Sequence, residues 1–179
     1  MTRLVPLVCP GCQAAFTPGR MDHRVLCCRQ CPTAVDLAHD GLQSYPVRVA
    51  TGDGLPGLYW ALAGDLIVNR FKASQPAVTP LGKVSHAGQT LPYSVTVPLH
   101  DIGLALAHAD ALRRVAKPLV VQAWTPEPGR KPPEGSVGRR EAERIAHQVC
   151  VTLITRADGS VFHLDVSLRV TSCIVLRVD

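Results

Sequence analysis

Hydrophobic and polar residues alternate most regularly in the C-terminal part of the chain. From residue 164 to residue 178, apolar side chains occupy every second position except 172. The preceding Asp158-Gly159 dipeptide is typical of a two-residue hairpin turn. Pairing across this turn places Val149 opposite Leu168 and gives both strands one apolar face, which would lie on the core. The alternation therefore predicts a C-terminal β-hairpin whose first strand includes residues 149–157.

A different periodicity follows Asp101 and predicts an amphipathic helix. Between residues 102 and 116 the apolar side chains recur at intervals of three and four, the spacing of one helix face. These positions are Ala105, Leu106, Ala109, Leu112, Val115 and Ala116. Asp101 is a suitable N-cap, and Pro118 ends the helix because proline cannot donate the hydrogen bond that a helix interior needs.

The remaining hydrophobic runs predict short strands and one more helix. Strands are expected at residues 47–50, 58–62, 66–71 and 93–97, and a short buried strand at 119–124. A second helix is expected near Arg139, capped by Ser136. Frequent proline and glycine predict loops at residues 74–92 and 125–138. These elements indicate an α+β fold with a mostly antiparallel sheet, two helices and the C-terminal β-hairpin.

The composition is that of a globular protein. Hydrophobic residues make up 46% of the 179 residues and charged residues 18%, which excludes a disordered chain. No apolar run reaches the roughly 18 residues that a membrane span needs, and the N-terminal region lacks the long apolar stretch of a secretory signal. We therefore expect a cytoplasmic protein without a membrane partner.

The spacing of four cysteines carries the clearest chemical signal. Cys9-Pro-Gly-Cys12 and Cys28-Arg-Gln-Cys31 are two CxxC turns separated by fifteen residues. Each turn can place two sulfurs on one side of a metal ion, and the segment between them is long enough to fold back as a hairpin. Residues 25–26 and 35–37 then read as short strands beside the second turn. The pattern predicts one structural zinc ion held by Cys9, Cys12, Cys28 and Cys31.

Two other interpretations of the cysteines are less consistent with the sequence. A disulfide framework would require an oxidising compartment, and a redox CxxC would normally occur as a single copy on a βαβ unit. Cys27 is adjacent to a predicted ligand and could compete with it, but only Cys28 and Cys31 repeat the CxxC spacing. Cys150 and Cys173 lie in segments with a strand pattern, and we expect both to be buried free thiols.

Four protein ligands would leave the zinc ion without an open coordination position, so the metal is expected to hold structure and not to catalyse. The motifs of phosphate-binding loops, dinucleotide-binding turns, zinc proteases and serine hydrolases are all missing from the sequence. His163, Asp165 and Ser167 alternate along one strand, where residues two apart are separated by about 7 Å and cannot form a triad. An enzyme that uses His163 or His100 therefore ranks last.

The charge of the chain favours a polyanionic partner. The formal net charge is +5, and residues 113–144 alone contribute +4, from eight basic and four acidic residues. Arginine suits phosphate because its planar guanidinium can donate two parallel hydrogen bonds. The residues expected to contact nucleic acid are Arg20, Arg24, Arg29, Arg113, Arg114, Arg130, Lys131, Arg139 and Arg140.

We expect a non-catalytic protein that contacts DNA or RNA together with other protein subunits. The alternative is a protein–protein adaptor that contacts no nucleic acid, which the few charges and the mean hydropathy of +0.13 favour. The expected domains are a zinc ribbon over residues 1–42 and an α+β domain over residues 46–179. The sequence does not indicate what the loop at residues 125–138 contacts.

The two CxxC turns resemble those of the zinc-ribbon superfamily over roughly the first 40 residues. That resemblance implies a structural zinc ion and a role in transcription, replication or ribonucleoprotein machines. A small basic protein that opens with a four-cysteine module is also similar in layout to the small Cas8-like subunit of type IV CRISPR effector complexes. In that family the subunit helps to read the motif that flanks the target on duplex DNA. The similarity covers the layout and the four cysteines only, so it assigns no DNA-reading residue.

Overall fold

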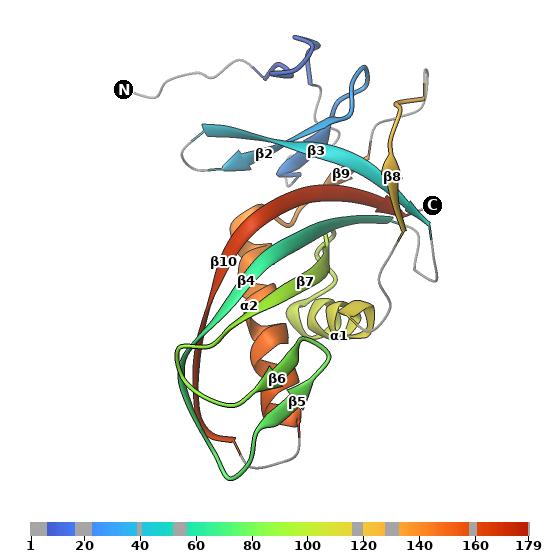
Figure 1. Cartoon of the computed structure of the whole chain (residues 1–179). Helices are drawn as coiled ribbons and strands as arrows, with labels where there is room; N and C mark the ends of the chain where they lie inside the picture. Colours follow the sequence, from blue (N-terminus) through green and yellow to red (C-terminus); the bar gives the residue numbers. More distant parts are fainter. Residues whose placement is uncertain are drawn as a thin grey trace.

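The chain is a mixed α+β protein built on a strongly curved sheet (Figure 1). The computed structural model describes residues 7–16, 23–38, 41–51, 57–115, 120–127, 133–157 and 161–178. Within these ranges the chain forms ten strands and two helices.

The main sheet contains eight strands in the order β7-β4-β10-β3-β2-β1-β9, and β8 pairs with β3 outside this path. The strands are β1 (Val25–Cys27), β2 (Thr33–Ala38), β3 (Gly41–Thr51), β4 (Gly57–Ala73), β7 (Thr90–Pro98), β8 (Val120–Ala123), β9 (Glu134–Gly135) and β10 (Val161–Val178). A separate two-stranded sheet consists of β5 (Ala77–Thr79) and β6 (Gly82–Val84). The pairing of β10 with β3 is parallel, and the other described pairings are antiparallel.

β4 and β10 form a long ribbon that curves around α2 (Figure 1). They pair along almost their whole lengths, with three register shifts that bend the ribbon. At the shift between Val170 and Ser172, the opposing residue on β4 is Gly64. A Cβ atom at Gly64 would collide with the carbonyl oxygen of Arg169 and lie 2.9 Å from the amide nitrogen of Thr171. The close approach of the two backbones therefore requires glycine there.

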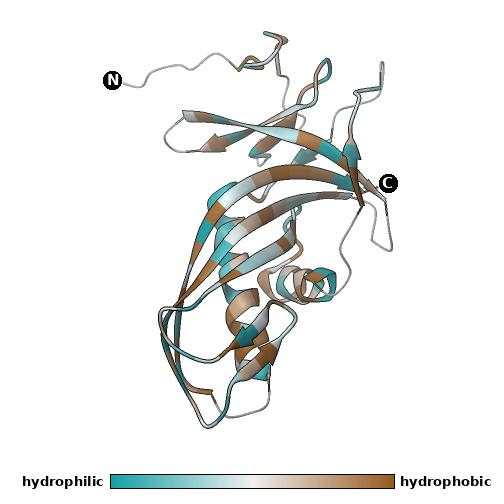
Figure 2. Ribbon diagram, in the orientation of Figure 1, coloured by the Kyte–Doolittle hydropathy of each residue, from teal (hydrophilic) through white to brown (hydrophobic). Residues whose placement is uncertain are grey.

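The helices α1 (Leu104–Val115) and α2 (Arg139–Arg156) lie against one face of the sheet and bury the main hydrophobic core. Trp60 and Leu62 of β4 contribute to this core together with Ile145 and Val149 of α2. The alternating hydropathy of β4 and β10 is visible in Figure 2. The apolar face predicted for residues 164–178 is not continuous, because Val166 and Val175 belong to the main core whereas Leu176 and Val178 belong to a second, smaller cluster with Tyr59. Neither described helix is long and apolar enough to cross a membrane.

The predicted C-terminal β-hairpin is wrong. Residues 139–156 form α2, and β10 pairs with β4 and β3 instead of with residues 149–157. The buried positions of α2 recur at intervals of one, three and four: Ala142, Ile145, Ala146, Val149, Cys150 and Ile154. The apolar residues at 149, 151 and 153 imitate a strand over a short window, and the helical period appears only over the longer one. Cys150 consequently lies in a helix, and Asp158-Gly159 lies outside the described residues.

The predicted helix after Asp101 exists, but its orientation differs from the prediction. Its buried residues are Ala107, Asp110, Ala111 and Arg114, whereas Ala105, Leu106 and Ala109 face solvent. Asp110 and Arg114 can be buried because they form an ion pair of 2.9 Å with each other. Tertiary contacts have thus overridden the apolar periodicity of α1.

Three local expectations are also corrected by the structure. The strand predicted to be buried at 119–124 corresponds to β8, whose four residues are all exposed. The predicted loop at 74–92 contains β5, β6 and the start of β7. The predicted loop at 125–138 contains β9, which adds to the sheet beside β1. Proline and glycine therefore interrupt these strands without excluding them.

The N-terminus of α2 is capped by Asp36 of β2, and not by Ser136 as predicted. The amide nitrogen of Arg139 donates a hydrogen bond of 2.7 Å to Asp36 Oδ2, and the N-cap residue Gly138 forms no side-chain cap. Ser136 Oγ instead accepts a hydrogen bond from the amide of Asp101. The buried carboxylate of Asp36 thus compensates the positive end of the helix dipole and attaches β2 to α2.

The sheet is continuous across the predicted domain boundary. β3 pairs with β2 through residues 41–46 and with β10 through residues 47–50. The division into a ribbon at 1–42 and an α+β domain at 46–179 remains a prediction, with its boundary inside this single strand.

Replacing Asp36 by alanine should lower the free energy of unfolding by about 1–2 kcal/mol, because it removes the cap of α2. Replacing Ser136 by alanine should cost less, since its hydroxyl bonds only the amide of Asp101. Urea denaturation followed by circular dichroism measures both. A larger loss for Ser136→Ala would show that the helix is capped as the sequence suggested.

Replacing Gly64 by alanine should lower the free energy of unfolding by about 3 kcal/mol or more, because the new methyl group meets backbone atoms that cannot move independently. Gly88 provides the control, since its φ of +83° is strained for alanine but no atom lies within 4 Å of its Cβ position. Gly88→Ala should cost about 1 kcal/mol. Equal losses in thermal or urea unfolding would contradict the close approach of β4 and β10.

Candidate metal centre

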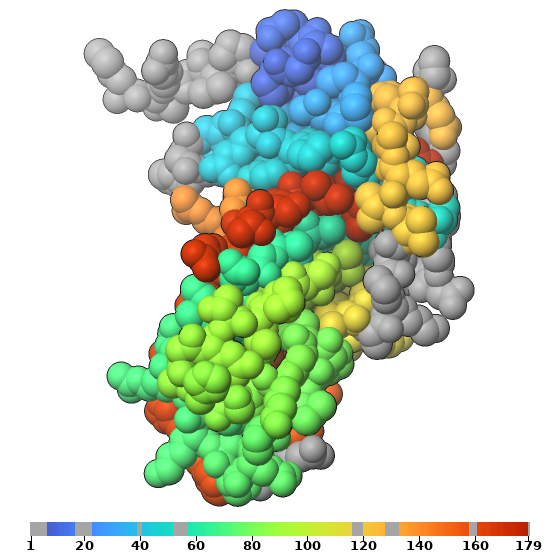
Figure 3. All heavy atoms as spheres, in the orientation of Figure 1, coloured from blue at the N-terminus to red at the C-terminus, as the bar shows by residue number. Residues whose placement is uncertain are grey.

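The four predicted cysteine ligands come from two turns. The N-terminal residues that carry them gather at one end of the molecule (Figure 3). The first knuckle, residues 9–12, lies between Val8 and Ala15, which pair as an isolated antiparallel bridge. The second knuckle, residues 28–31, connects β1 to β2. Both predicted strands beside the second knuckle are present, and their pairing fixes its position.

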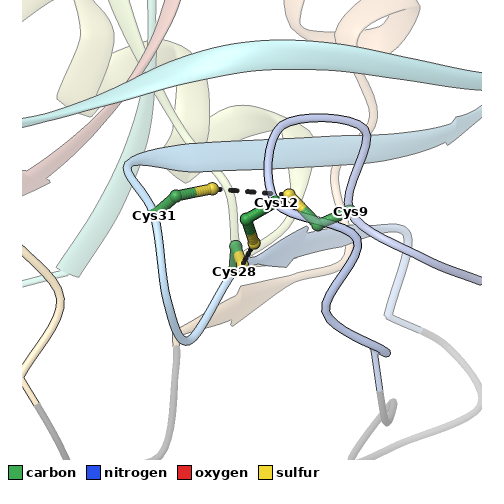
Figure 4. Close-up of side chains that lie close together, drawn as sticks. All are labelled: Cys9, Cys12, Cys28 and Cys31. Atoms are coloured by element: carbon green, nitrogen blue, oxygen red, sulfur yellow. Dashed lines mark hydrogen bonds between the residues drawn. The ribbon is translucent and has the colours of Figure 1, made fainter.

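The structure brings the four sulfur atoms together. All four lie within 4.8 Å of one another, and the cluster contains Cys9, Cys12, Cys28 and Cys31. The Sγ atoms of Cys9 and Cys31 are 3.4 Å apart, as are those of Cys12 and Cys28 (Figure 4). These separations are far longer than a disulfide bond, and the cysteines are free.

The cluster has the dimensions that a tetrahedral metal site requires. Zinc–sulfur bonds of about 2.3 Å place the sulfurs of a tetrahedral site about 3.8 Å apart. The observed separations of 3.4 Å for two of the pairs, within a 4.8 Å cluster, lie close to that value. The four thiols could therefore hold one metal ion with only small adjustments.

Backbone amides donate to the first cysteine of each knuckle. The amide nitrogen of Gln30 lies 3.4 Å from Cys28 Sγ and donates to it. Burial raises the pKa of the Cys9 thiol, but hydrogen bonds from the amides of Cys12 and Gly11 and from neighbouring thiols lower it to about 7. The thiolate of Cys9, the form of cysteine that binds metal, is thus favoured. Burial instead raises the pKa of the Cys28 thiol and raises that of the Cys31 thiol to about 12.

Gly11 keeps space open beside the sulfurs. A Cβ atom at this position would lie 3.1 Å from Thr33 Oγ1 and 3.4 Å from Cys31 Sγ. Thr33 Oγ1 also accepts a hydrogen bond of 3.3 Å from the Cys31 thiol. A side chain at residue 11 would therefore press on the cluster and on the threonine that orients one of its members.

Cys27 lies outside the cluster although it is adjacent to Cys28. β1 directs Cys27 into the hydrophobic core, where burial raises the pKa of its thiol to about 12. The alternation of a strand sends these neighbours to opposite sides. Burial likewise raises the pKa of Cys150 and Cys173 to about 12. Both are free thiols, but only Cys150 is buried as predicted, and Cys173 is partly buried.

Some arginines predicted to contact nucleic acid are exposed near the knuckles. Arg29, in the second knuckle, is exposed, and so is Arg24 just before β1. Arg24 also reaches the start of α2, because its Cζ atom lies 3.0 Å from the Cβ position of Gly138. Arg140, in the first turn of α2, is exposed as well. The fold thus brings Arg24 next to the helix end that carries Arg140.

Other predicted contacts have structural partners. The buried Arg114 donates to Asp110 and, at 2.6 Å, to the hydroxyl of Tyr59, so its guanidinium is not available to a phosphate. Arg139 donates to Glu143 at 2.7 Å and to the hydroxyl of Tyr45 at 3.4 Å. Arg113, on α1, is exposed. The other three predicted contacts, Arg20, Arg130 and Lys131, lie outside the described residues.

The sequence analysis did not assign roles to Gly11, Thr33 or Asp36. Gly11 could have been identified from its place between two ligands, because a tight turn around a metal favours a residue without a side chain. Thr33 follows the second knuckle by two residues and could have been considered for the same reason. Asp36 gives no local signal, because its partner, the amide of Arg139, is 103 residues away.

A groove of about 750 Å³ lies between α1 and α2 and is lined by His108 and His147 among other residues. His108 Nε2 lies 3.0 Å from Thr152 Oγ1, and His147 Nε2 lies 2.9 Å from the carbonyl oxygen of Val166. Among the described residues no carboxylate bonds either histidine, so these residues supply no nucleophile–base–carboxylate chain at the groove. Asp101 Oδ1 accepts a hydrogen bond from the amide of Gly103.

Comparisons with known proteins give no match. No protein-family model, no curated protein and no solved structure is matched by the chain. The cysteine cluster and the charges around it therefore carry the functional proposal.

Replacing Cys28 by alanine should abolish stoichiometric metal binding, because three thiols remain at the cluster. Replacing the adjacent Cys27 by alanine should leave one metal ion per chain, although the smaller core residue should cost stability of about 1 kcal/mol. Inductively coupled plasma mass spectrometry of the purified variants measures the metal. Loss of the metal from Cys27→Ala with retention in Cys28→Ala would reverse the assignment.

Proposed function

We propose that the chain is a non-catalytic zinc-binding protein that contacts nucleic acid as a subunit of a larger complex. The observation that carries this proposal is the four-thiol cluster, with the exposed Arg29 inside one of its knuckles. Zinc is the proposed metal because four thiolates in a tetrahedron are a soft donor set that suits it. Its role is structural, since four protein ligands leave no coordination position for a substrate or water.

The cluster supports nucleic-acid contact because it presents arginine on a rigid turn. A metal ion would fix the second knuckle from both ends, through Cys28 and Cys31. Arg29 between them would then project from a turn of low mobility, which reduces the entropy lost when it binds a phosphate. Arg24 and Arg140 extend the same basic surface toward α2.

The complex is proposed to be a ribonucleoprotein effector of the CRISPR type. This part of the proposal rests on the similarity in layout to the small Cas8-like subunit of type IV complexes. It requires neighbouring protein subunits, and the apolar side chains exposed on α1 and β8 are suited to contact them.

A second candidate is a protein–protein adaptor that uses the metal only to hold its shape. The exposure of Val120 and Val121 on β8 favours it, because natural sheet edges that meet no partner usually carry charged residues. The adaptor and the nucleic-acid-binding protein differ in their response to salt, since phosphate contacts weaken steeply as salt rises.

Replacing both Arg24 and Arg29 by glutamate should weaken binding to nucleic acid, because it removes about two phosphate contacts. The slope of the logarithm of the binding constant against the logarithm of the salt concentration should become less steep by roughly 2. Fluorescence anisotropy with labelled duplex DNA, single-stranded DNA and RNA at several salt concentrations measures this. The control is the double variant Arg70→Glu and Lys72→Glu, which makes the same charge change on exposed positions of β4.

Equal weakening by both double variants would show that only net charge matters and would contradict a site at the knuckles. No salt-sensitive binding by the zinc-loaded wild type, alone or within its complex, would overturn nucleic-acid contact and leave the adaptor.

A further inference from the structure

Three strands end the main sheet among the described residues, and β8 is the one without protection against further pairing. β7 contains Pro92 and Pro98, and β9 is two residues long and carries the charged Glu134. β8 has the sequence Val-Val-Gln-Ala, without a charge or a proline, and all four of its residues are exposed. Natural edge strands that meet no partner usually carry prolines or charges, so β8 is the edge most open to another strand.

The pairing of β3 determines which backbone groups of β8 point outward. β8 and β10 both pair with residues 48–50 of β3, so they lie on its opposite edges, and β8 shares its edge with β2. The amide of Val47 donates a hydrogen bond of 2.9 Å to the carbonyl oxygen of Pro32, just before β2. The backbone groups of Val47 therefore point to this edge. Because the direction alternates along a strand, those of Val49 and Thr51 also point to it and bond β8.

The outward-pointing residues of β8 are therefore Val121 and Ala123. The partners of Val49 and Thr51 on β8 are Gln122 and Val120, whose N–H and C=O groups consequently point to β3. The alternate residues direct theirs away from β3. β8 lies at one side of the molecule (Figure 1), and within the described ranges no strand pairs with its outer edge.

These outward groups are complementary to themselves when two copies of β8 run antiparallel. A two-fold axis at Gln122 places Val121 of each copy opposite Ala123 of the other. Each of these pairs can exchange two N–H···O=C bonds, so every outward donor and acceptor of β8 is bonded. In the other antiparallel registers, some outward groups of β8 face residues outside the strand.

The side chains also fit this register. Val121 of each copy lies beside the smaller Ala123 of the other, on the same face of the joined sheet. Gln122 lies opposite its own copy, and its side-chain amide can both donate and accept, so the two amides can bond each other. A charged residue at this position would repel its copy.

We infer that two copies of this chain associate through β8, in an antiparallel pair with a two-fold axis at Gln122 that joins their sheets. A second copy supplies the matching donors and acceptors by symmetry, together with an uncharged amide opposite Gln122. The contact leaves the exposed side chains of α1 for other subunits. The inference depends neither on the metal nor on nucleic-acid contact.

The contact should be weak. A strand of four residues is about 14 Å long, so the pair buries less than the roughly 800 Å² per partner of a stable interface. We therefore expect reversible association with a dissociation constant in the micromolar range or above.

Sedimentation velocity of the full-length metal-loaded chain over a wide concentration range tests the inference. The wild type should move from monomer to dimer. Val121→Pro should stay monomeric, because proline removes an outward N–H group but no bond to β3. Gln122→Lys should raise the dissociation constant about tenfold or more, because two like charges then face each other.

Ser94→Lys is the matched control, since it makes the same charge change at an exposed position of β7. It should dimerise like the wild type. Circular dichroism and metal content verify that each variant is folded.

A charge exchange tests the two-fold geometry itself. Gln122→Glu alone should weaken the dimer as Gln122→Lys does. An equimolar mixture of the two variants should form a heterodimer of at least wild-type affinity, because a lysine then faces a glutamate across the axis.

Amide hydrogen exchange followed by NMR tests the register. The amides of Val121 and Ala123 should exchange more slowly as the protein concentration rises. The amide of Gln122 should be protected at every concentration, because it bonds β3.

A wild type that stays monomeric at all concentrations would overturn the inference, as would a mixture of Gln122 variants that does not recover. A dimer that persists in Val121→Pro, or that is lost equally in Ser94→Lys, would assign the contact to another surface. If β8 pairs only with a strand of a different protein, the wild type alone is a monomer and Val121→Pro no longer enters the larger complex, which also overturns the inference.

Discussion

Hydrogen bonding along both edges of β10 holds the molecule together as one sheet. β4 pairs with one edge of β10 and supports the hydrophobic core with its two helices. β3 pairs with the other edge and continues into the strands that carry the second knuckle. The cysteine-bearing region is too small to bury a core of its own, so its position depends on this pairing and on Asp36, and a metal ion bound by the four thiols would fix it further.

The candidate metal site could be predicted because its information is local. Cys9 and Cys12 are brought together by one turn, and Cys28 and Cys31 by another, so only the meeting of the turns depends on the fold. The prediction of the β-hairpin was wrong because a short strand-like window around Val149 was favoured over the longer helical period of residues 142–154. The prediction of the buried face of α1 was wrong for a different reason. Whether Leu106 is buried depends on the elements that pack against α1, and these are distant in the sequence.

For the charged residues, too, the sequence shows one part of the information and the fold the other. The number of arginines can be read from the sequence, but whether each can bind a phosphate depends on its neighbours in space. Arg114 is paired with Asp110 and Tyr59, and Arg139 with Glu143 and Tyr45. The composition alone does not distinguish these two from the exposed Arg29. The proposed nucleic-acid surface accordingly includes fewer arginines than the sequence suggested, and these lie nearer to the cysteine cluster.

The position of β10 between β4 and β3 has a consequence for biosynthesis. The ribosome makes both neighbouring strands before it makes β10, so the nascent chain must keep their facing edges apart until the strand between them emerges. If β3 paired with β4 first, the two edges that β10 needs would already be occupied and β10 could not enter the sheet. The knuckles, in contrast, are complete once the first β2 residues have been translated. Early metal capture would therefore restrain β2 and the start of β3 while β4 waits for its partner, and it would lower the risk of misassembly.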